Sequence, residues 1–341
     1  MKLEAIGWDR VFASQLQENQ FNGDVPGRVA RCEREHFLVW TEAGEADATV
    51  GGAFRHSETV WPCTGDWVML RGRSVIVEIL RRRTLLARKE PGRRIREQAL
   101  AANIDVAFVV SGLDLDYNPR RLERYLTLIY ESGARPVILL NKADLRSDLP
   151  DVLARTGQTA PGVPVLAVSA LQNFGLNELA AHIRPGETAA LIGSSGAGKS
   201  SILNRLLGDD RQQIHEVRNS DSRGRHTTTR RELFVMPGGW LLMDLPGLRE
   251  LQLWADPEQI DQTFADITDL AAECRFRDCT HQREPGCAVR DADLDPQRLA
   301  SFHKLQREVA YLDRQLDRNL ARETKQRWKS IHKAMRHNPK Q

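Results

Sequence analysis

The stretch "LIGSSGAGKSSILNRLL" contains the residues best suited to chemistry in this chain. Its spacing fits G-x-x-x-x-G-K-[ST], with an apolar strand-like run before it and a helix-like run after it. Glycines let backbone N–H groups surround phosphates, the lysine reaches the β- and γ-phosphates, and the serine hydroxyl ligates Mg²⁺. We therefore expect a nucleotide-binding loop made of Gly193, Ser194, Ser195, Gly196, Ala197, Gly198, Lys199, Ser200 and Ser201.

A second segment suited to phosphate chemistry, "LLMDLPG", follows the first. Asp244 ends an apolar strand and can hold Mg²⁺, directly or through water, while Gly247 lets its backbone N–H approach a γ-phosphate. Alone, D-x-x-G is also typical of an ordinary turn after a strand. Its position after a phosphate loop and behind a buried strand favours a role beside Lys199 and Ser200 in phosphate and magnesium binding.

Between these segments lies the polar sequence "SRGRHTTTR", which has no packing pattern. A threonine here can offer its hydroxyl to Mg²⁺, and such segments order only when a triphosphate is bound. Thr227, Thr228 and Thr229 compete for that role, and spacing does not choose between them. The alternative is a surface loop without a ligand.

The sequence "NKAD" at 141–144 follows a strand-like apolar run. Asp144 can accept hydrogen bonds from guanine N1–H and the exocyclic amine, a donor pair that adenine lacks. Asn141 can bind another edge of the base, and the Lys142 stem can cover its face. Downstream, "AVSA" ends the next strand, so Ser169 and the Ala170 backbone could contact guanine O6.

These motifs appear in the order base loop, "SA", phosphate loop, threonine segment and "DLPG". A GTPase normally presents its phosphate loop first, so the order predicts a circular permutation in which the strand at 106–112 comes first. From 106 onward, apolar runs alternate with helical ones, which indicates a buried, mainly parallel sheet. The segment 27–88 instead contains short alternating runs with glycine-rich turns, as in a small antiparallel barrel or sandwich.

The sequence "ECRFRDCTHQREPGC" has the spacing C-x4-C-x-H-x5-C. Three thiolates and one imidazole complete a tetrahedral Zn²⁺ site with no open position, so the predicted site is structural. Its ligands would be Cys274, Cys279, His281 and Cys287. The alternative is a set of reduced, free cysteines, and the remaining two, Cys32 and Cys63, lie in strand-like contexts that favour core positions.

The net charge of +3 is unevenly distributed along the chain. Residues 301–341 hold eleven Lys and Arg against four Asp and Glu, and residues 71–96 hold ten against two. Such basic stretches favour a polyanionic partner such as nucleic acid, although a solvent-exposed helix face without a partner would have the same composition. No apolar run approaches a membrane span and no secretory signal opens the chain, so we expect a cytoplasmic protein without a membrane partner.

Together, these motifs resemble the ribosome-small-subunit-dependent GTPases, the RsgA or YjeQ family. The resemblance implies a multidomain α/β protein with an N-terminal OB-type β-barrel, a circularly permuted P-loop GTPase domain and a C-terminal helical zinc-binding domain. It also implies a role in late maturation of the small ribosomal subunit, with rRNA, GTP and GDP as partners. Nothing in the sequence requires more than a monomer.

The resemblance also bears on individual residues and on domain boundaries. Among the three threonines it favours Thr228 as the magnesium ligand, and Leu245 in "DLPG" is a mild departure from the family's usual motif. The predicted boundaries are a 1–24 extension, a 25–95 barrel, a 96–255 GTPase domain and a 256–341 zinc-binding and basic helical domain.

The residue that orients the attacking water is not the usual one. Many GTPases place Gln directly after D-x-x-G, but Leu248 stands there and cannot form the hydrogen bond. His226 is the nearest candidate with a usable side chain, the alternative being an exposed loop histidine. The predicted catalytic set is His226, Thr228, Lys199 and Asp244, with magnesium at Ser200, Thr228 and Asp244. An RNA-binding scaffold with a silent nucleotide site and a P-loop ATPase remain as rival functions.

Overall fold

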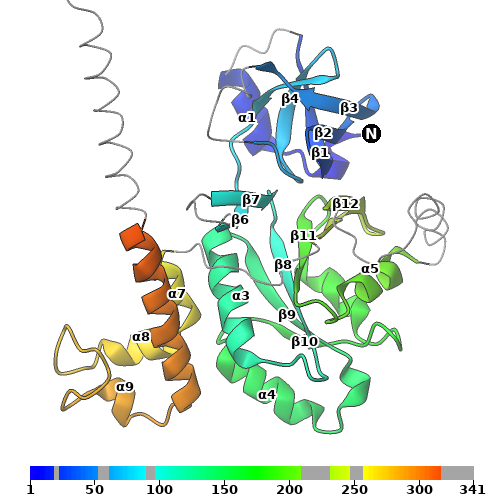
Figure 1. The fold of residues 1–341 in the computed structure, drawn as a ribbon. Coiled ribbons are helices and arrows are strands. Elements are labelled where there is room, and N and C mark those ends of the chain that lie inside the picture. The colour runs from blue at the N-terminus through cyan, green and yellow to red at the C-terminus, as the bar shows by residue number, and fades with distance from the viewer. Residues whose placement is uncertain (19–22, 53–60, 90–96, 209–230, 246–255, 316–341) are drawn as a thin grey trace, which may run out of the picture. The chain divides into compact units, whose positions relative to one another are not determined.

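The computed structural model describes residues 1–18, 23–52, 61–89, 97–208, 231–245 and 256–315 (Figure 1). The chain divides into two compact units. The first contains Met1–Ala87 and Ala99–Leu251, and the second contains Arg88–Gln98 and Gln252–Gln341. No helix in these described ranges is both long and apolar enough to cross a membrane.

The first unit begins with a closed five-stranded barrel. Its strands are β1 (Val25–Glu33), β2 (His36–Thr41), β3 (Gly44–Val50), β4 (Trp67–Arg71) and β5 (Val75–Ile79). The order β1-β2-β3-β5-β4 closes because β4 also pairs with β1. Alternate residues such as Val29, Phe37 and Val68 fill the interior, which explains the alternating sequence pattern and confirms the predicted barrel. Cys63 is buried, and burial raises the pKa of the Cys32 thiol to about 12.

The N-terminal segment packs against this barrel. It forms a short 3₁₀ helix, η1 (Leu3–Ile6), and a helix, α1 (Arg10–Glu18). The rings of Trp8 and Phe12 lie 4.7 Å and 5.7 Å from the ring of Trp67 in β4, and Phe12 is fully buried. These aromatic contacts make the first residues part of the packed unit.

A second sheet in the same unit has the predicted mainly parallel form. Its strands are β8 (Val106–Gly112), β9 (Arg135–Asn141), β10 (Val165–Ala167), β11 (Thr188–Gly193), β12 (Glu232–Val235) and β13 (Leu241–Asp244). They lie in the order β10-β9-β8-β11-β13-β12, and all neighbours are parallel except the β12–β13 hairpin. Every residue of β8 and β11 is buried, as expected for strands covered on both faces.

Helices cover both faces of this sheet (Figure 1). They are α3 (Pro119–Ser132), η2 (Ala143–Leu145), α4 (Leu149–Thr159), η3 (Leu176–His182) and α5 (Lys199–Leu207). Residues of η3 and α5 share one apolar cluster with Phe108 and Val110, whereas α3 contacts β8 and β9. Local signals set the ends of α3: the Asn118 side chain caps the first turn, and Gly133 closes the last with φ 81°.

The barrel and the second sheet are joined by strand pairing. Arg31 of β1 pairs with Glu232 of β12, and their side chains form an ion pair of 3.2 Å. This pairing makes one continuous sheet of eleven strands. Since β12 is an edge strand of the second sheet, the barrel covers backbone groups that would otherwise be exposed.

A buried arginine strengthens the same junction. The Arg28 guanidinium donates to the carbonyls of Ile6 (2.5 Å), Gly65 (3.4 Å) and Asn103 (3.3 Å) and to the Thr188 hydroxyl (2.7 Å). Burial lowers its pKa to about 10, although Asp105 and Asp66 oppose the shift. The side chain thus links the barrel to the first residue of β11.

The second unit contains a small helical core. Its elements are α7 (Pro257–Thr263), α8 (Ala265–Ala271), α9 (Ala288–Asp291) and a helix described from 296 to 315. Arg298 binds both carboxylate oxygens of Asp266, at 2.7 Å and 2.5 Å, and lies over the Phe264 ring. A separate two-stranded sheet is formed by β6 (Leu85–Lys89) and β7 (Glu97–Ala102).

Candidate nucleotide site and metal centre

Three of the loops singled out from the sequence lie at one edge of the parallel sheet. The base loop follows β9, the "SA" pair follows β10, and the phosphate loop follows β11. Because parallel strands bring their carboxyl ends together, residues far apart in sequence become neighbours there. This edge is therefore the candidate nucleotide site.

The phosphate loop depends on glycine at two close approaches. A Cβ on Gly193 would lie 2.2 Å from the Val110 carbonyl oxygen, and a Cβ on Gly198 would lie 2.1 Å from the Asn141 amide nitrogen. Gly198 also has φ 98°, a conformation that side chains disfavour. The motif glycines thus let the loop pack against both the neighbouring strand and the base loop.

The Lys199 side chain folds back onto the phosphate loop that precedes it in the sequence. Its ammonium donates to the carbonyl oxygens of Gly193 (2.8 Å) and Ser194 (2.7 Å). Partial burial lowers the pKa of Lys199, while Asp244 and Asp116 act to raise it. Ser200 and Ser201 follow in the first turn of α5, where backbone N–H groups have no partner within the helix.

Asn141 connects all three loops. Its side-chain amide donates to the Ala197 carbonyl (2.9 Å) in the phosphate loop, and its oxygen accepts from the Ala170 N–H (3.2 Å). Asn141 is only 2% exposed, so these hydrogen bonds satisfy a buried amide. Lys142, with φ 65°, donates to the Gly196 carbonyl at 2.8 Å. The base loop and the phosphate loop are therefore joined directly.

The other base-loop residues differ in exposure. Asp144 lies in η2 with an exposed side chain, as a residue that reads a ligand requires. Ser169 is buried, and its hydroxyl accepts the Gln172 N–H at 3.1 Å. Asp144 is thus the more accessible of the two, and Ser169 shapes the loop.

Asp244 lies beside the phosphate loop. It ends β13, which is parallel to β11, and its backbone pairs with Leu191. It is 7% exposed, as a carboxylate held close to a cation would be. The predicted His226, Thr228 and Gly247 lie outside the described residues.

Three further residues at this edge, Asp114, Asp116 and Arg205, belong to none of the sequence motifs. Asp114 and Asp116 follow β8, which ends at the same edge, and they bind Lys142 and Ser194 respectively. Arg205 of α5 donates to the carbonyls of Ala170 and Leu171, both at 3.2 Å. The two aspartates could have been recognised as candidate site residues, because they directly follow the first strand of the sheet. Nothing in the sequence around Arg205 indicates its position.

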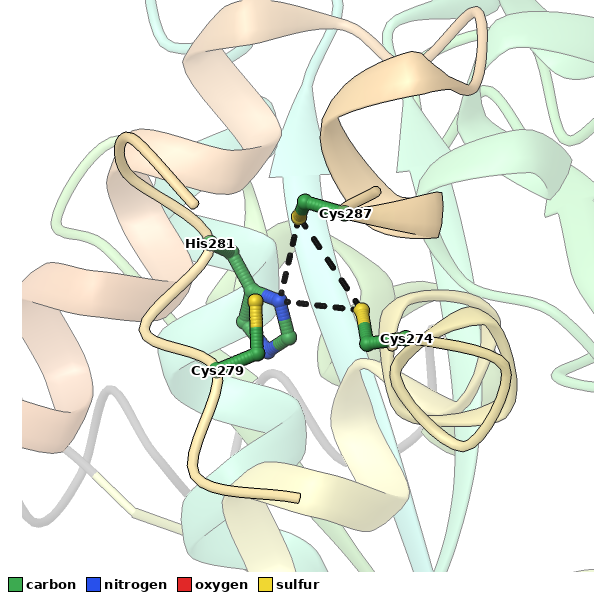
Figure 2. A group of neighbouring side chains, drawn as sticks. All are labelled: Cys274, Cys279, His281 and Cys287. Carbon is green, nitrogen blue, oxygen red and sulfur yellow. Dashed lines mark hydrogen bonds between the residues drawn. The ribbon is translucent and has the colours of Figure 1, made fainter. Parts of the chain in front are cut away.

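The four predicted metal ligands converge in the second unit (Figure 2). The His281 Nδ1 lies 3.6 Å from the Cys274 sulfur and 3.5 Å from the Cys287 sulfur, and these two sulfurs are 4.0 Å apart. All four ligand atoms, including that of Cys279, lie within 4.8 Å of one another. A tetrahedral site with metal–sulfur bonds near 2.3 Å has sulfur separations of about 3.8 Å, so the cluster could bind a metal.

Neighbouring backbone groups support the cluster. The N–H groups of Val289 and Ala288 lower the pKa of the Cys274 thiol, whereas desolvation raises the pKa of the neighbouring Cys279 thiol to about 11. The Glu284 carboxylate accepts from the Thr280 N–H (3.0 Å) and hydroxyl (2.5 Å) and from two further backbone N–H groups. These bonds hold the pKa of Glu284 well below its usual value and fix the loop between the histidine and the last cysteine.

Comparison with known proteins agrees with this geometry. The family model described as RsgA GTPase matches residues 79–254. The chain belongs to the RsgA GTPase family. This confirms the resemblance drawn from the motifs. An ABC transporter model also matches residues 176–339, a range that includes the phosphate loop but not the base loop.

Curated relatives match over nearly the whole chain. A small ribosomal subunit biogenesis GTPase RsgA from Opitutus terrae is 46% identical over 98% of this chain and 97% of the relative. A protein of the same name from Syntrophotalea carbinolica is 44% identical over 91% of this chain and 90% of the relative.

Two solved structures are similar to this chain in fold. YjeQ from Thermotoga maritima has a TM-score of 0.62 at 24% identity, covering 84% of this chain and 99% of that one. YloQ, titled a circularly permuted GTPase, has a TM-score of 0.60 at 23% identity, covering 86% and 97%. Together with the closed barrel and the Cys/His cluster of this chain, they confirm the predicted fold class, with its circularly permuted GTPase domain.

Proposed function

We propose that this chain is a GTPase of late small-ribosomal-subunit maturation, which binds the subunit and its rRNA and hydrolyses GTP to GDP and phosphate. The observation that carries this proposal is the Asn141 side chain, which joins the base loop, the "SA" pair and the phosphate loop. Family membership and the printed names of the relatives support the ribosomal role.

The phosphate half of the site would be formed by Gly193–Ser201. Its backbone N–H groups and Lys199 would bind the phosphates. Mg²⁺ would be held by Ser200, Asp244 and Thr228, and it would supply charge neutralisation at the β- and γ-phosphates. The proximity of Asp244 to Lys199 supports this assignment, and His226 would orient water during hydrolysis.

Guanine selection would come from Asp144. Its exposed carboxylate can accept the two donors on the Watson–Crick edge of guanine, while Asn141, Lys142, Ser169 and Ala170 form the surroundings. Adenine would leave the carboxylate without those donors. The base loop therefore argues against the rival P-loop ATPase.

The Cys/His cluster would hold one structural zinc ion. Its donor set, Cys274, Cys279, His281 and Cys287, suits zinc and leaves no open coordination position, and its ligand atoms lie within 4.8 Å of one another. Zinc would cross-link the short loop that carries all four ligands. We assign it no part in the chemistry of GTP.

We further propose a cytoplasmic monomer that binds rRNA through the barrel and the basic C-terminal segment. The supporting observation is the local charge, because residues 301–341 hold eleven basic against four acidic side chains. The rival is an RNA-binding assembly scaffold whose nucleotide site binds but does not turn over GTP.

Phosphate release from GTP and from ATP, measured with and without purified small subunits, tests the function. We expect slow turnover of GTP alone, strong stimulation by subunits, and little turnover of ATP. Bound but unhydrolysed GTP in the presence of subunits would favour the scaffold. Subunit-stimulated ATP turnover would favour the ATPase.

Two variants sharpen the assay. Asp144→Asn should lose preference for GTP and gain affinity for xanthosine triphosphate, because xanthine presents a carbonyl where guanine presents its amine. His226→Ala should bind GTP normally but lose the stimulated turnover. Unchanged stimulated turnover in His226→Ala would eliminate its proposed role.

A further inference from the structure

Two aspartates outside the nucleotide motifs lie in the loop at 113–118, between β8 and α3. The Asp116 carboxylate accepts the Gly112 N–H at 3.2 Å, which ties the loop to the end of β8. At the other end, the Asn118 side chain caps α3. The loop is therefore fixed by the strand before it and the helix after it.

Asp116 holds the first residue of the phosphate loop after Gly193. The Ser194 hydroxyl lies 2.6 Å from each carboxylate oxygen of Asp116. The carbonyl of the same serine accepts the Lys199 ammonium at 2.7 Å. Ser194 is thus bound from both sides where the chain leaves β11, and its position decides where the following N–H groups point.

The charge of Asp116 is offset locally. An uncompensated carboxylate beside a polyphosphate would repel it. Arg121 donates to the Asp116 carboxylate at 2.6 Å and to the Asp116 carbonyl at 3.1 Å. Arg121 lies in the first turn of α3, so the helix that follows the loop supplies the compensating cation.

We propose that Asp116 is a positioning residue for the phosphate half of the nucleotide, because it fixes Ser194 and thereby the path of the phosphate loop. This inference rests on the proposed nucleotide function. On the base side, the Asp114 carboxylate binds the Lys142 ammonium, which also donates to the Gly196 carbonyl at 2.8 Å. Asp116 would thus position the loop that binds the phosphates, and Asp114 would position Lys142 beside the base.

The test measures release of fluorescent GDP from the full-length chain. Asp116→Ala and Ser194→Ala should each accelerate release about tenfold, as expected for loss of a charge-assisted hydrogen bond. The double variant should release GDP no faster than the faster single variant, because both remove the same contact. Additive effects, or wild-type release from both single variants, would overturn the proposal.

Inosine diphosphate separates phosphate effects from base effects, because it differs from GDP only in the base. Asp116→Ala should weaken binding of both diphosphates by the same factor, whereas Asp114→Asn should change the ratio between them. A changed ratio in Asp116→Ala would contradict a role confined to the phosphates. General damage to the fold would instead lower the melting temperature together with both affinities.

Two controls complete the experiment. Glu187→Gln removes an ion pair with Arg135 (2.9 Å) at the opposite edge of the same sheet and should leave GDP release unchanged. Asp116→Asn keeps the side-chain shape and one acceptor, so its release rate should lie between those of wild type and Asp116→Ala. If the wild type neither binds nor hydrolyses GTP, the proposed function fails. If it does both while these variants release GDP at the wild-type rate, only the positioning role fails.

Discussion

The nucleotide loops and the Cys/His cluster are assembled over very different distances along the chain. Asn141 and Ala197, which are hydrogen-bonded, are 56 positions apart, whereas Cys274 and Cys287 are 13 apart. The first site is positioned by a buried parallel sheet, and the second by a short loop with little regular structure. The nucleotide site should therefore keep its shape without its ligand, while the cluster should depend on its metal.

The largest effect should follow Cys287→Ser, which replaces the thiol of a proposed zinc ligand with a hydroxyl. Since metal binding contributes folding free energy in such sites, we expect zinc affinity to fall by roughly two orders of magnitude or more. Hydrogen exchange across 257–315 should increase, because Cys287 also precedes α9. Metal analysis and exchange measurements would show this, with GDP affinity as the comparison. Unchanged zinc content would contradict a four-ligand site.

Asn141→Ala tests the sheet-positioned site. It removes two hydrogen bonds of a buried amide and leaves the Ala197 carbonyl and the Ala170 N–H without that partner. We expect GDP to bind about thirtyfold more weakly, while zinc content stays unchanged. Asn204→Ala, on the exposed side of α5, is the matched control and should bind GDP as wild type does. Equal affinities in the two variants would show that the bridge is dispensable.

Glu284→Ala tests whether the loop of the cluster needs support beyond its ligands. The carboxylate organises backbone groups but does not touch the metal position, so we expect zinc affinity to fall only about threefold to tenfold. Competition with a chelator measures this difference. Glu258→Ala, an exposed glutamate of α7, should retain wild-type affinity. An effect as large as that of Cys287→Ser would mean that the loop collapses without Glu284.

The smallest effect concerns pH. Burial lowers the pKa of Lys199, so its ammonium should lose its proton at a lower pH than that of an ordinary lysine. Only the protonated form attracts phosphate, so GDP affinity should be maximal below this lowered pKa and fall as pH rises through it. Binding measured between pH 7 and 10 tests this. Lys199→Arg, which stays charged, should lose less affinity than the wild type over that range, and its remaining loss would come from deprotonation of the guanine N1–H that Asp144 binds.

The sequence predicted the site where functional groups lie in continuous motifs. The phosphate loop, "NKAD" and the cysteine cluster each combine particular residue types at a fixed spacing within a short stretch of chain. The neighbouring strand-like and loop-like runs were therefore enough to predict which element each segment follows. Asp116 escaped prediction because its position after the first strand of the sheet belongs to no named motif, and Arg28 because a single arginine in a strand is usually a surface residue. Only the pairing of distant strands brings Asp116 to Ser194 and Arg28 to Thr188.

The continuous sheet formed by β1 and β12 has a practical consequence for dissecting this molecule. A truncated chain that begins after the barrel would leave β12 with a bare edge open to self-association and would remove the cation bound to Thr188, where the strand to the phosphate loop begins. Loss of turnover in such a fragment would therefore not show that RNA binding drives hydrolysis. Substitutions on the outer surface of the barrel can separate RNA binding from GTP hydrolysis, because they leave the pairing of β1 with β12 intact.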